Sequence, residues 1–164
     1  MHSYEEGAKM IIRKFKKWDF ENYVILEQEF FDYHNKYKTL LQDINPRKRD
    51  LRKEFNQLIK EKNFFYIAED KGNVLGYIYG KIKKVEDNQL ELRRIGDLNS
   101  LIVTKKYRRK GIANMLVREF IKWLKSKNIF CITLNCNVKN REMIKFAEDL
   151  GFKQQHIKFG KLLK

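Results

Sequence analysis

The chain has 164 residues, and 36 lysines and arginines against 21 aspartates and glutamates give it a formal net charge of +15. This length suits one domain, and 43% apolar residues can fill a core without metals or disulfides. No apolar run approaches the roughly 18 to 20 residues of a membrane span, and no apolar signal segment is present, so we predict a single-domain cytoplasmic protein without a membrane partner. The positive charge favours nucleic acid, an anionic cofactor or an acidic protein as partner, although a lysine-rich composition alone also produces it.

Metal and disulfide chemistry are not expected. The two cysteines, Cys131 and Cys136, are spaced to point to opposite faces of a strand. The three histidines, His2, His34 and His156, are scattered and none is at metal-ligand spacing from a cysteine. The sequence therefore predicts no metal site.

The first third of the chain predicts one strand and two helices. A short strand is expected over residues 9–16, after which Asp19 can cap a helix. Apolar and aromatic residues recur along that helix at helical spacing, with one glutamate among them: Phe20, Tyr23, Val24, Glu27, Phe30, Phe31 and Tyr37. Beyond Asn45-Pro46, a second helix places Leu51, Phe55, Leu58 and Ile59 on one face and ends near Asn63.

The remaining elements alternate between strands and helices. Residues 64–70 and 74–85 flank a glycine-bearing turn and predict a β-hairpin. A strand over 91–103 is followed by a basic connection and, from Gly111, by a helix with an apolar stripe. A buried strand over 130–138, a helix opening near Asn140 and ended by Gly151, and a final strand within 153–163 complete the chain.

The order of these elements predicts an α/β fold with a mixed, mostly antiparallel sheet and helices on both faces. A strand, helix and strand in succession form a βαβ unit, which needs parallel neighbours, whereas the hairpin is antiparallel. We predict one domain over 1–164, in which 9–63 supply the first strand and two helices, 64–152 the core and 153–164 a terminal strand.

A cationic loop before a helix predicts an anion site. Five of the six residues from Lys105 to Lys110 are cationic, and Gly111 and Ala113 follow at the start of the helix. Glycine lets the backbone approach a phosphate, and the free amides of the first helical turn point at its oxygens. The loop lacks the Lys-Ser or Lys-Thr pair of a Walker loop. A nucleic-acid contact or a solvated run of charge is the alternative.

Two motifs in order resemble the GNAT acetyltransferase superfamily. The first is Leu101-x-Val103 followed by Arg108-x-x-Gly111-x-Ala113, and the second is Asn140 with Phe146 and Leu150-Gly151-Phe152 at the spacing of that family. The resemblance covers 91–152 well and 64–90 in outline, and it makes 64–152 an acetyl-CoA-binding core. It also implies that the first strand and the helices of 9–63 lie on the substrate side. It implies an acetyl-CoA-dependent N-acetyltransferase, with acetyl-CoA as co-substrate and an amine as acceptor.

The resemblance also assigns binding roles. It implies that the backbone of Leu101, Ile102 and Val103 pairs with the pantetheine amides, and that an amide near Val103 stabilises the oxyanion. The pyrophosphate would then be held by the loop and the helix start, with Asn140 as a further contact: Arg108, Arg109, Lys110, Gly111, Ile112, Ala113 and Asn114.

Two catalytic residues follow from the same resemblance. Asp97 occupies the place of a carboxylate base and shares strand parity with Leu101 and Val103, although an ion pair with Arg93 or Arg94 is the alternative. Ala147 stands where many members have a tyrosine that protonates the CoA thiolate, so solvent or another hydroxyl such as that of Tyr107 is the candidate source of that proton.

The acceptor remains open at this level. A protein amine is favoured over a small amine, and Glu27, Glu29 and Asp32 either attract that cation or form a solvated face. A nucleic-acid-binding protein and a CoA-binding domain without catalysis are the alternatives, and the protein is expected to be a monomer or homodimer.

Overall fold

A five-stranded sheet in the order β1-β2-β3-β4-β5 forms the centre of the computed structural model, which describes residues 10–37, 49–85 and 94–161. The strands are β1 (Ile11–Lys14), β2 (Phe64–Asp70), β3 (Asn73–Lys84), β4 (Arg94–Val103) and β5 (Ile132–Leu134). Successive strands pair antiparallel except β4 and β5, which are parallel. The predicted mixed, mostly antiparallel sheet is therefore confirmed.

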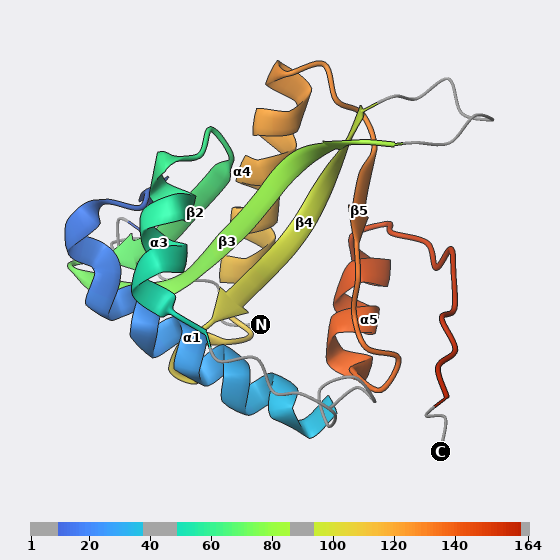
Figure 1. The fold of residues 1–164 in the computed structure, drawn as a ribbon, viewed down its shortest axis with the longest axis horizontal. Helices are drawn as coiled ribbons and strands as arrows, with labels where there is room; N and C mark the ends of the chain where they lie inside the picture. Colours follow the sequence, from blue (N-terminus) through green and yellow to red (C-terminus); the bar gives the residue numbers. More distant parts are fainter. Residues whose placement is uncertain (1–9, 38–48, 86–93, 162–164) are drawn as a thin grey trace.

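The helices cover both faces of this sheet, as predicted (Figure 1). α1 (Phe20–His34) and α3 (Leu51–Lys60) lie on one face, α4 (Ile112–Ser126) lies on the other, and α5 (Arg141–Asp149) lies beside β5. Three short 3₁₀ turns, η1 (Lys17–Asp19), η2 (Asn35–Tyr37) and η3 (Lys105–Tyr107), adjoin them. Within the described ranges, no helix combines the length and apolar character that crossing a membrane requires.

Each face of the sheet has its own buried core. Ile78, Leu98 and Leu116 belong to an apolar cluster between the sheet and α4. Tyr77, the neighbour of Ile78 in β3, instead belongs to a cluster with α1 and α3. Adjacent strand residues thus serve opposite cores, as the two-residue period of a strand requires.

Two glycines of the sheet face α4 and are in direct contact with its side chains. A Cβ atom on Gly80 would lie 2.3 Å from the ring of Phe120, and one on Gly96 would lie 2.4 Å from a methyl of Leu124. Any larger side chain would push α4 away. These two glycines therefore set the distance of α4, and with it the position of its N-terminus.

Three details of the sequence prediction differ from the structure. The strand expected over 130–138 is restricted to Ile132–Leu134, because β5 separates from β4 beyond this point. Residues 153–161 form no strand, contrary to prediction, because this exposed segment has no strand beside it among the described residues. Asp19 precedes α1, but its carboxylate accepts from the Lys16 amide and binds Arg13 rather than capping the helix. The Asn45-Pro46 break and the start of the 91–103 strand lie outside the described residues.

Candidate functional site

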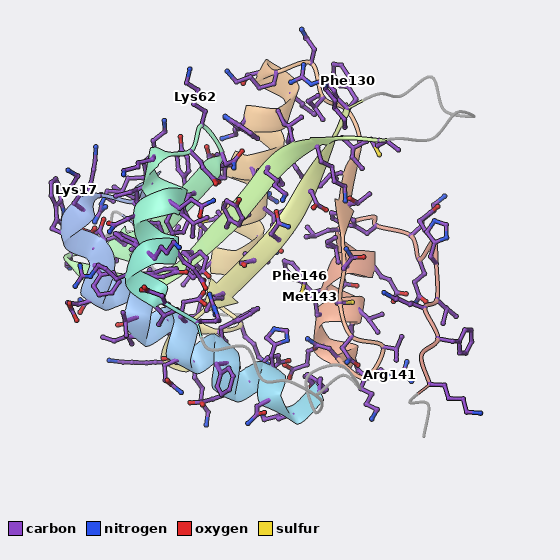
Figure 2. The ribbon with its side chains drawn as sticks, viewed as in Figure 1. Lys17, Lys62, Phe130, Arg141, Met143 and Phe146 are labelled. Carbon is purple, nitrogen blue, oxygen red and sulfur yellow. The ribbon has the colours of Figure 1, made fainter. Side chains whose placement is uncertain are left out.

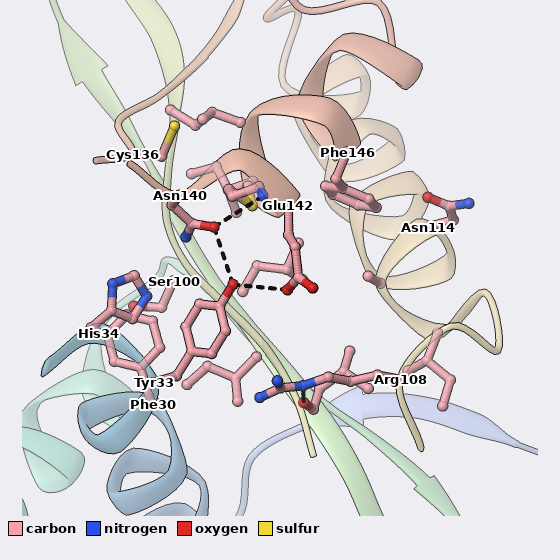
Figure 3. Close-up of a pocket in the computed structure, with 18 of the residues that line it drawn as sticks. Phe30, Tyr33, His34, Ser100, Arg108, Asn114, Cys136, Asn140, Glu142 and Phe146 are labelled. Atoms are coloured by element: carbon pink, nitrogen blue, oxygen red, sulfur yellow. Dashed lines mark hydrogen bonds between the residues drawn. The ribbon is translucent and has the colours of Figure 1, made fainter. Parts of the chain in front are cut away.

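A cavity opens where β4 and β5 separate. Their pairing runs only from Gly96–Ile132 to Leu98–Leu134, while β4 continues to Val103. The resulting cavity of about 740 Å³ is bounded by β4, the loop after it, the first turn of α4, the segment after β5, α5 and the end of α1 (Figure 3). The lining includes every residue that the resemblance assigns to the cofactor: Leu101, Ile102, Val103, Arg108, Arg109, Lys110, Gly111, Ile112, Ala113, Asn114 and Asn140.

A β-bulge interrupts β4 at the cavity. Leu98 pairs with Gly80 and Ser100 with Tyr79, so Asn99 is an extra residue without a partner on β3. A bulge of this kind reverses which face the following side chains occupy. Leu98 accordingly packs on the α4 side and Ile102, four residues later, on the α1 side.

The bulge overturns the expectation that Asp97 shares a face with Leu101 and Val103. Before the bulge, Leu98 belongs to the α4-side cluster, so Asp97 faces α1. After the bulge, Leu101 and Val103 pack against the α4-side cluster. Counting residues along an uninterrupted strand therefore gave the wrong parity.

Beyond the bulge, β4 presents backbone groups to the cavity. The Thr104 amide donates to the Leu75 carbonyl at 2.9 Å, which makes these opposite residues a hydrogen-bonded pair. Because such pairs alternate along an antiparallel ladder, Leu101 and Val103 direct their backbone N–H and C=O groups away from β3. The Val103 carbonyl accepts from Arg108 Nε at 3.0 Å, consistent with that direction (Figure 3). Leu101 thus offers a donor and an acceptor along the free edge.

The N-terminus of α4 is open. Gly111 occupies the cap position with φ +79° and provides no side-chain cap, so the first-turn amides of Ile112, Ala113 and Asn114 lack an intrahelical partner. A Cβ atom on Gly111 would meet nothing within 4 Å, so space lies directly before the helix. With Arg108 beside it in the lining, this helix end can bind an anion.

α1 crosses the open end of the sheet from β3 to the segment after β5. Near its middle, the buried Glu27 accepts a hydrogen bond from the Tyr77 hydroxyl of β3 and pairs with Arg49 at 2.6 Å. Just beyond its end, the Tyr37 carbonyl accepts from Asn137 Nδ2 at 2.9 Å. The last two turns of α1 therefore form one wall of the cavity.

Tyr33 links this wall to α5. Its hydroxyl lies 3.1 Å from Asn140 Oδ1 and 3.0 Å from Glu142 Oε2, and the Arg108 guanidinium lies 5.0 Å from its ring centre (Figure 3). Asn140 also caps α5 by accepting from the Met143 amide at 3.1 Å. Burial, together with the bond to Glu142, raises the pKa of Tyr33 well above its ordinary value.

Sequence reasoning placed the first helix on the substrate side but did not name the α1 and α5 side chains that line the cavity. Phe30, Tyr33 and His34 line the cavity, as do Met143 and Phe146 of α5. Figure 2 shows Met143 and Phe146 projecting from α5 toward the sheet, whereas Arg141 points away. The stripe predicted for this helix included Phe30 but not His34, and the sequence could not indicate that the buried face extends past the sheet.

The three acidic residues of α1 that could attract the acceptor amine have separate roles. Glu27 is buried against Tyr77 and Arg49, so it belongs neither to a solvated face nor to an amine-attracting surface. Glu29 Oε2 accepts from the Lys105 amide at 3.0 Å and so ties α1 to the loop after β4. Asp32 is exposed and accepts from Gln28.

The two predicted catalytic residues differ in position. Asp97 is buried and does not line the cavity, and its carboxylate pairs with Lys83 at 2.9 Å. The ion-pair partner is thus Lys83 rather than Arg94, while Arg93 lies outside the described residues. Tyr107 lines the cavity, and its ring is flanked by the ammonium groups of Lys106 and Lys110.

A family model described as the acetyltransferase (GNAT) family matches residues 16–152. The chain belongs to the GNAT family. This confirms the resemblance, and it extends the match into α1, where the sequence motifs gave no guide.

Sequence relatives of this GNAT chain are named as N-alpha-acetyltransferases. One from Sulfurisphaera tokodaii is 33% identical over 94 residues, which cover 55% of this chain and 56% of the relative. Another from Saccharolobus solfataricus is 34% identical over 100 residues, which cover 58% and 60%. The chain spans between about two fifths and three fifths of the length of the curated relatives that it matches.

Solved structures share the fold over nearly the whole chain. An aminoglycoside N-acetyltransferase AAC(6')-Iy in complex with CoA superimposes with a TM-score of 0.75 at 18% identity, covering 96% of this chain and 97% of its own. At that identity the likeness establishes the fold alone.

Proposed function

We propose that this GNAT protein transfers the acetyl group of acetyl-CoA to a primary amine by direct transfer in a ternary complex. The observation that carries the proposal is the free edge of β4 leading directly to the open N-terminus of α4. These two features match the two recognisable parts of the donor, an amide-bearing arm and a pyrophosphate.

The residues present fit acetyl-CoA. The free N–H and C=O groups of Leu101 suit the pantetheine amides, and the open amides of Ile112 to Asn114 suit the pyrophosphate. Arg108, Arg109 and Lys110 supply the countercharge, and Asn140 faces them across the cavity. Acetyl-CoA supplies a thioester carbonyl that an amine can attack.

The acyl end of such a donor belongs near the bulge. With the pyrophosphate at α4, the arm follows the free edge of β4, which ends where β5 rejoins β4 at Leu98. At about 3.3 Å per residue, Asn99 is about 13 Å from Val103. The unpaired backbone of Asn99 is therefore a better oxyanion donor than the amides near Val103.

Asp97 as base is a proposal drawn from the family, and Tyr107 as acid is a proposal that replaces the family's missing tyrosine. Lys83, Asn99 and Thr133 all bind the Asp97 carboxylate, which favours a structural role for it. Tyr107 follows β4 at the pyrophosphate end, so it suits a contact with the donor better than a proton transfer at the sulfur.

Nucleic-acid binding is the alternative use of the same charge. The cationic loop and the α4 N-terminus line a cavity, where they suit a small anion better than a duplex. A CoA-binding domain without catalysis remains a second alternative, which only an activity measurement distinguishes.

We further propose a protein amine, at an N-terminus or a lysine, as the acceptor in preference to a small amine. The support is the name N-alpha-acetyltransferase carried by the sequence relatives, since the aminoglycoside enzymes resemble this chain in fold alone.

Two measurements test the proposed function. Acetyl-CoA at a hundred times its dissociation constant should stabilise the fold by about 2.7 kcal/mol, whereas duplex DNA at 0.2 M salt should do less. Release of CoA is then assayed with peptide N-termini, lysine peptides, a polyamine and an amino sugar as acceptors.

Gly111→Val tests whether the N-terminus of α4 is the binding site for acetyl-CoA. Its branched side chain opposes φ +79° and fills the space before α4, so acetyl-CoA should no longer stabilise a protein that still folds. A DNA shift that exceeds the acetyl-CoA shift, or unchanged acetyl-CoA affinity in Gly111→Val, would contradict the proposal.

A further inference from the structure

α1 carries an ionisable side chain into the cavity that the family motifs do not use. His34 is the last residue of α1 and lies in the cavity lining, half-buried. It follows Leu26 and Phe30 at four-residue spacing, so it continues the face of α1 that packs on the sheet. Leu26 is buried in the α1-side core, whereas Phe30 and His34 extend this face over the gap between β4 and β5 (Figure 3).

The bulge turns β4 toward the same helix. Ser100, the first residue after the bulge, shares a face with Ile102, which packs in the core that contains α1 residues. Ser100 and Asn99 also line the cavity. The proposed acyl end of the donor and the imidazole of His34 therefore border the same space, on the side of the sheet away from α4.

Aromatic neighbours hold the imidazole. Its ring centre lies 4.0 Å from that of Phe30, 5.5 Å from that of Tyr33 and 6.5 Å from that of Tyr37. Burial lowers the pKa of His34 below its ordinary value, so the ring is neutral at pH 7 and can accept a proton.

The other titratable groups around the cavity are less suited to that task. Arg108, Arg109 and Lys110 are cations and have no lone pair to offer. The phenols of Tyr33, Tyr37 and Tyr107 and the thiol of Cys136 carry their own protons, and burial raises the pKa of Cys136. Glu142 is bound by Tyr33, lies 3.9 Å from Arg109 and is exposed to solvent.

We propose that His34 is the catalytic base that deprotonates the acceptor amine. One imidazole nitrogen takes a proton from the acceptor ammonium and passes it to solvent. The neutral nitrogen of the acceptor amine then forms the C–N bond to the acetyl carbon, and the C–S bond of the thioester breaks. A second proton, lost from that amine nitrogen, goes to the departing sulfur. This inference rests on the proposed acetyl transfer, and it places the acceptor amine on the α1 side of the sheet.

The test compares pH–rate profiles of the wild type, His34→Ala and the matched control His156→Ala, which alters an exposed histidine in the C-terminal segment. The acceptor is whichever amine of the panel above reacts fastest. At pH 7, kcat/KM of His34→Ala should fall about a hundredfold, and the deficit should shrink toward pH 10 as the amine deprotonates unaided. Added imidazole should restore part of the activity. His156→Ala should match the wild type, and all three proteins should bind acetyl-CoA equally by calorimetry.

Different outcomes overturn different claims. A deficit that is equal at every pH and is not rescued by imidazole would assign His34 a structural role, as would full activity in His34→Gln, a variant that keeps the polarity of the site. Wild-type protein that binds acetyl-CoA but acetylates no amine would overturn the proposed function, and the role of His34 with it.

Discussion

The two faces of the sheet are held to their helices by different interactions. On the α4 face the described core is apolar, and contact depends on the bare backbones of Gly80 and Gly96. Of the four polar residues buried in the described part of the chain, Asp19, Glu27 and Asp97 lie on the α1 face, and Asn140 caps α5. Apolar contact alone fixes α4, the helix proposed to bind the donor, whereas α1, which borders the proposed acceptor space, combines an apolar core with individual charged pairs.

This difference matters for function. Under the proposed function, the N-terminus of α4 must keep one position relative to β4, because its amides and the β4 edge would bind two parts of one molecule. Close packing allows few alternatives at such a contact. Charged pairs instead fix α1 at particular points, Arg13 with Asp19 and Arg49 with Glu27, so each can be changed separately.

The largest expected effect comes from disturbing the close contact on the α4 face. Gly80→Val places branched carbons where the Phe120 ring lies, and the free energy of unfolding should fall by about 3 kcal/mol. Lys84→Val, an exposed position of the same strand, should change it by less than about 0.5 kcal/mol. Urea denaturation measures both, and equal effects would mean that α4 is not tightly packed.

The buried pair beneath α1 should have the next largest effect. Glu27→Leu leaves the Tyr77 hydroxyl buried without its acceptor and removes one of the two ion-pair partners of Arg49, which keeps Glu54, and should cost about 2 kcal/mol of stability. Adding Tyr77→Phe to this variant removes the hydroxyl that has lost its acceptor, so the double variant should be about 1 kcal/mol more stable than Glu27→Leu alone. Denaturation midpoints of the two single variants and the double variant measure this. If the two single losses of stability simply add in the double variant, Glu27 and Tyr77 are not coupled.

Asp19 provides a pH-dependent test on the same face. Burial opposes its ionisation, but hydrogen bonds from Arg13 and from the Lys16 amide outweigh it and lower the pKa of Asp19. A lowered pKa stabilises the fold above the unfolded value of about 3.9, and this contribution disappears as the pH falls through the folded value. Asp19→Asn should therefore cost about 1.5 kcal/mol at pH 7, and the difference from wild type should vanish in strong acid. A difference that is independent of pH would contradict the ion pair.

The comparison also explains what the sequence could predict. Most elements of the described chain appear near their expected places, because apolar periodicity records which face of each element is buried. The loop from Arg108 to Asn114 was predictable because its chemistry is local: charges, a glycine and a helix start are adjacent in sequence. The anion-binding part of the proposed donor site follows from such neighbours.

The acceptor half was not predictable in the same way. Tyr33 meets Asn140 and Glu142 across more than a hundred residues, and no local pattern in either segment indicates the contact. The bulge at Asn99 also has no sequence signal, since neither it nor its neighbours Leu98 and Ser100 is glycine or proline. β5 is short because it diverges from β4. This divergence depends on both strands together, so the sequence of either strand alone does not indicate it.

The smallest expected effect concerns Asp97, whose assigned role depended on the parity that the bulge reverses. Lys83, Thr133 and Asn99 surround its carboxylate, and Lys83 is partly exposed, so the pair is screened by solvent. Asp97→Asn should therefore cost about 1 kcal/mol of stability, and its pH–rate profile should run parallel to that of the wild type. Asn99→Ala, which removes one donor to the same carboxylate, is the control for the local structure.

If Asp97 is the base instead, Asp97→Asn should lose about a hundredfold in kcat/KM at neutral pH and recover as the pH rises, while His34→Ala keeps the wild-type profile. The two hypotheses predict opposite profiles for Asp97→Asn and His34→Ala. One set of pH–rate profiles therefore decides whether Asp97 of β4 or His34 of α1 accepts the proton of the acceptor amine.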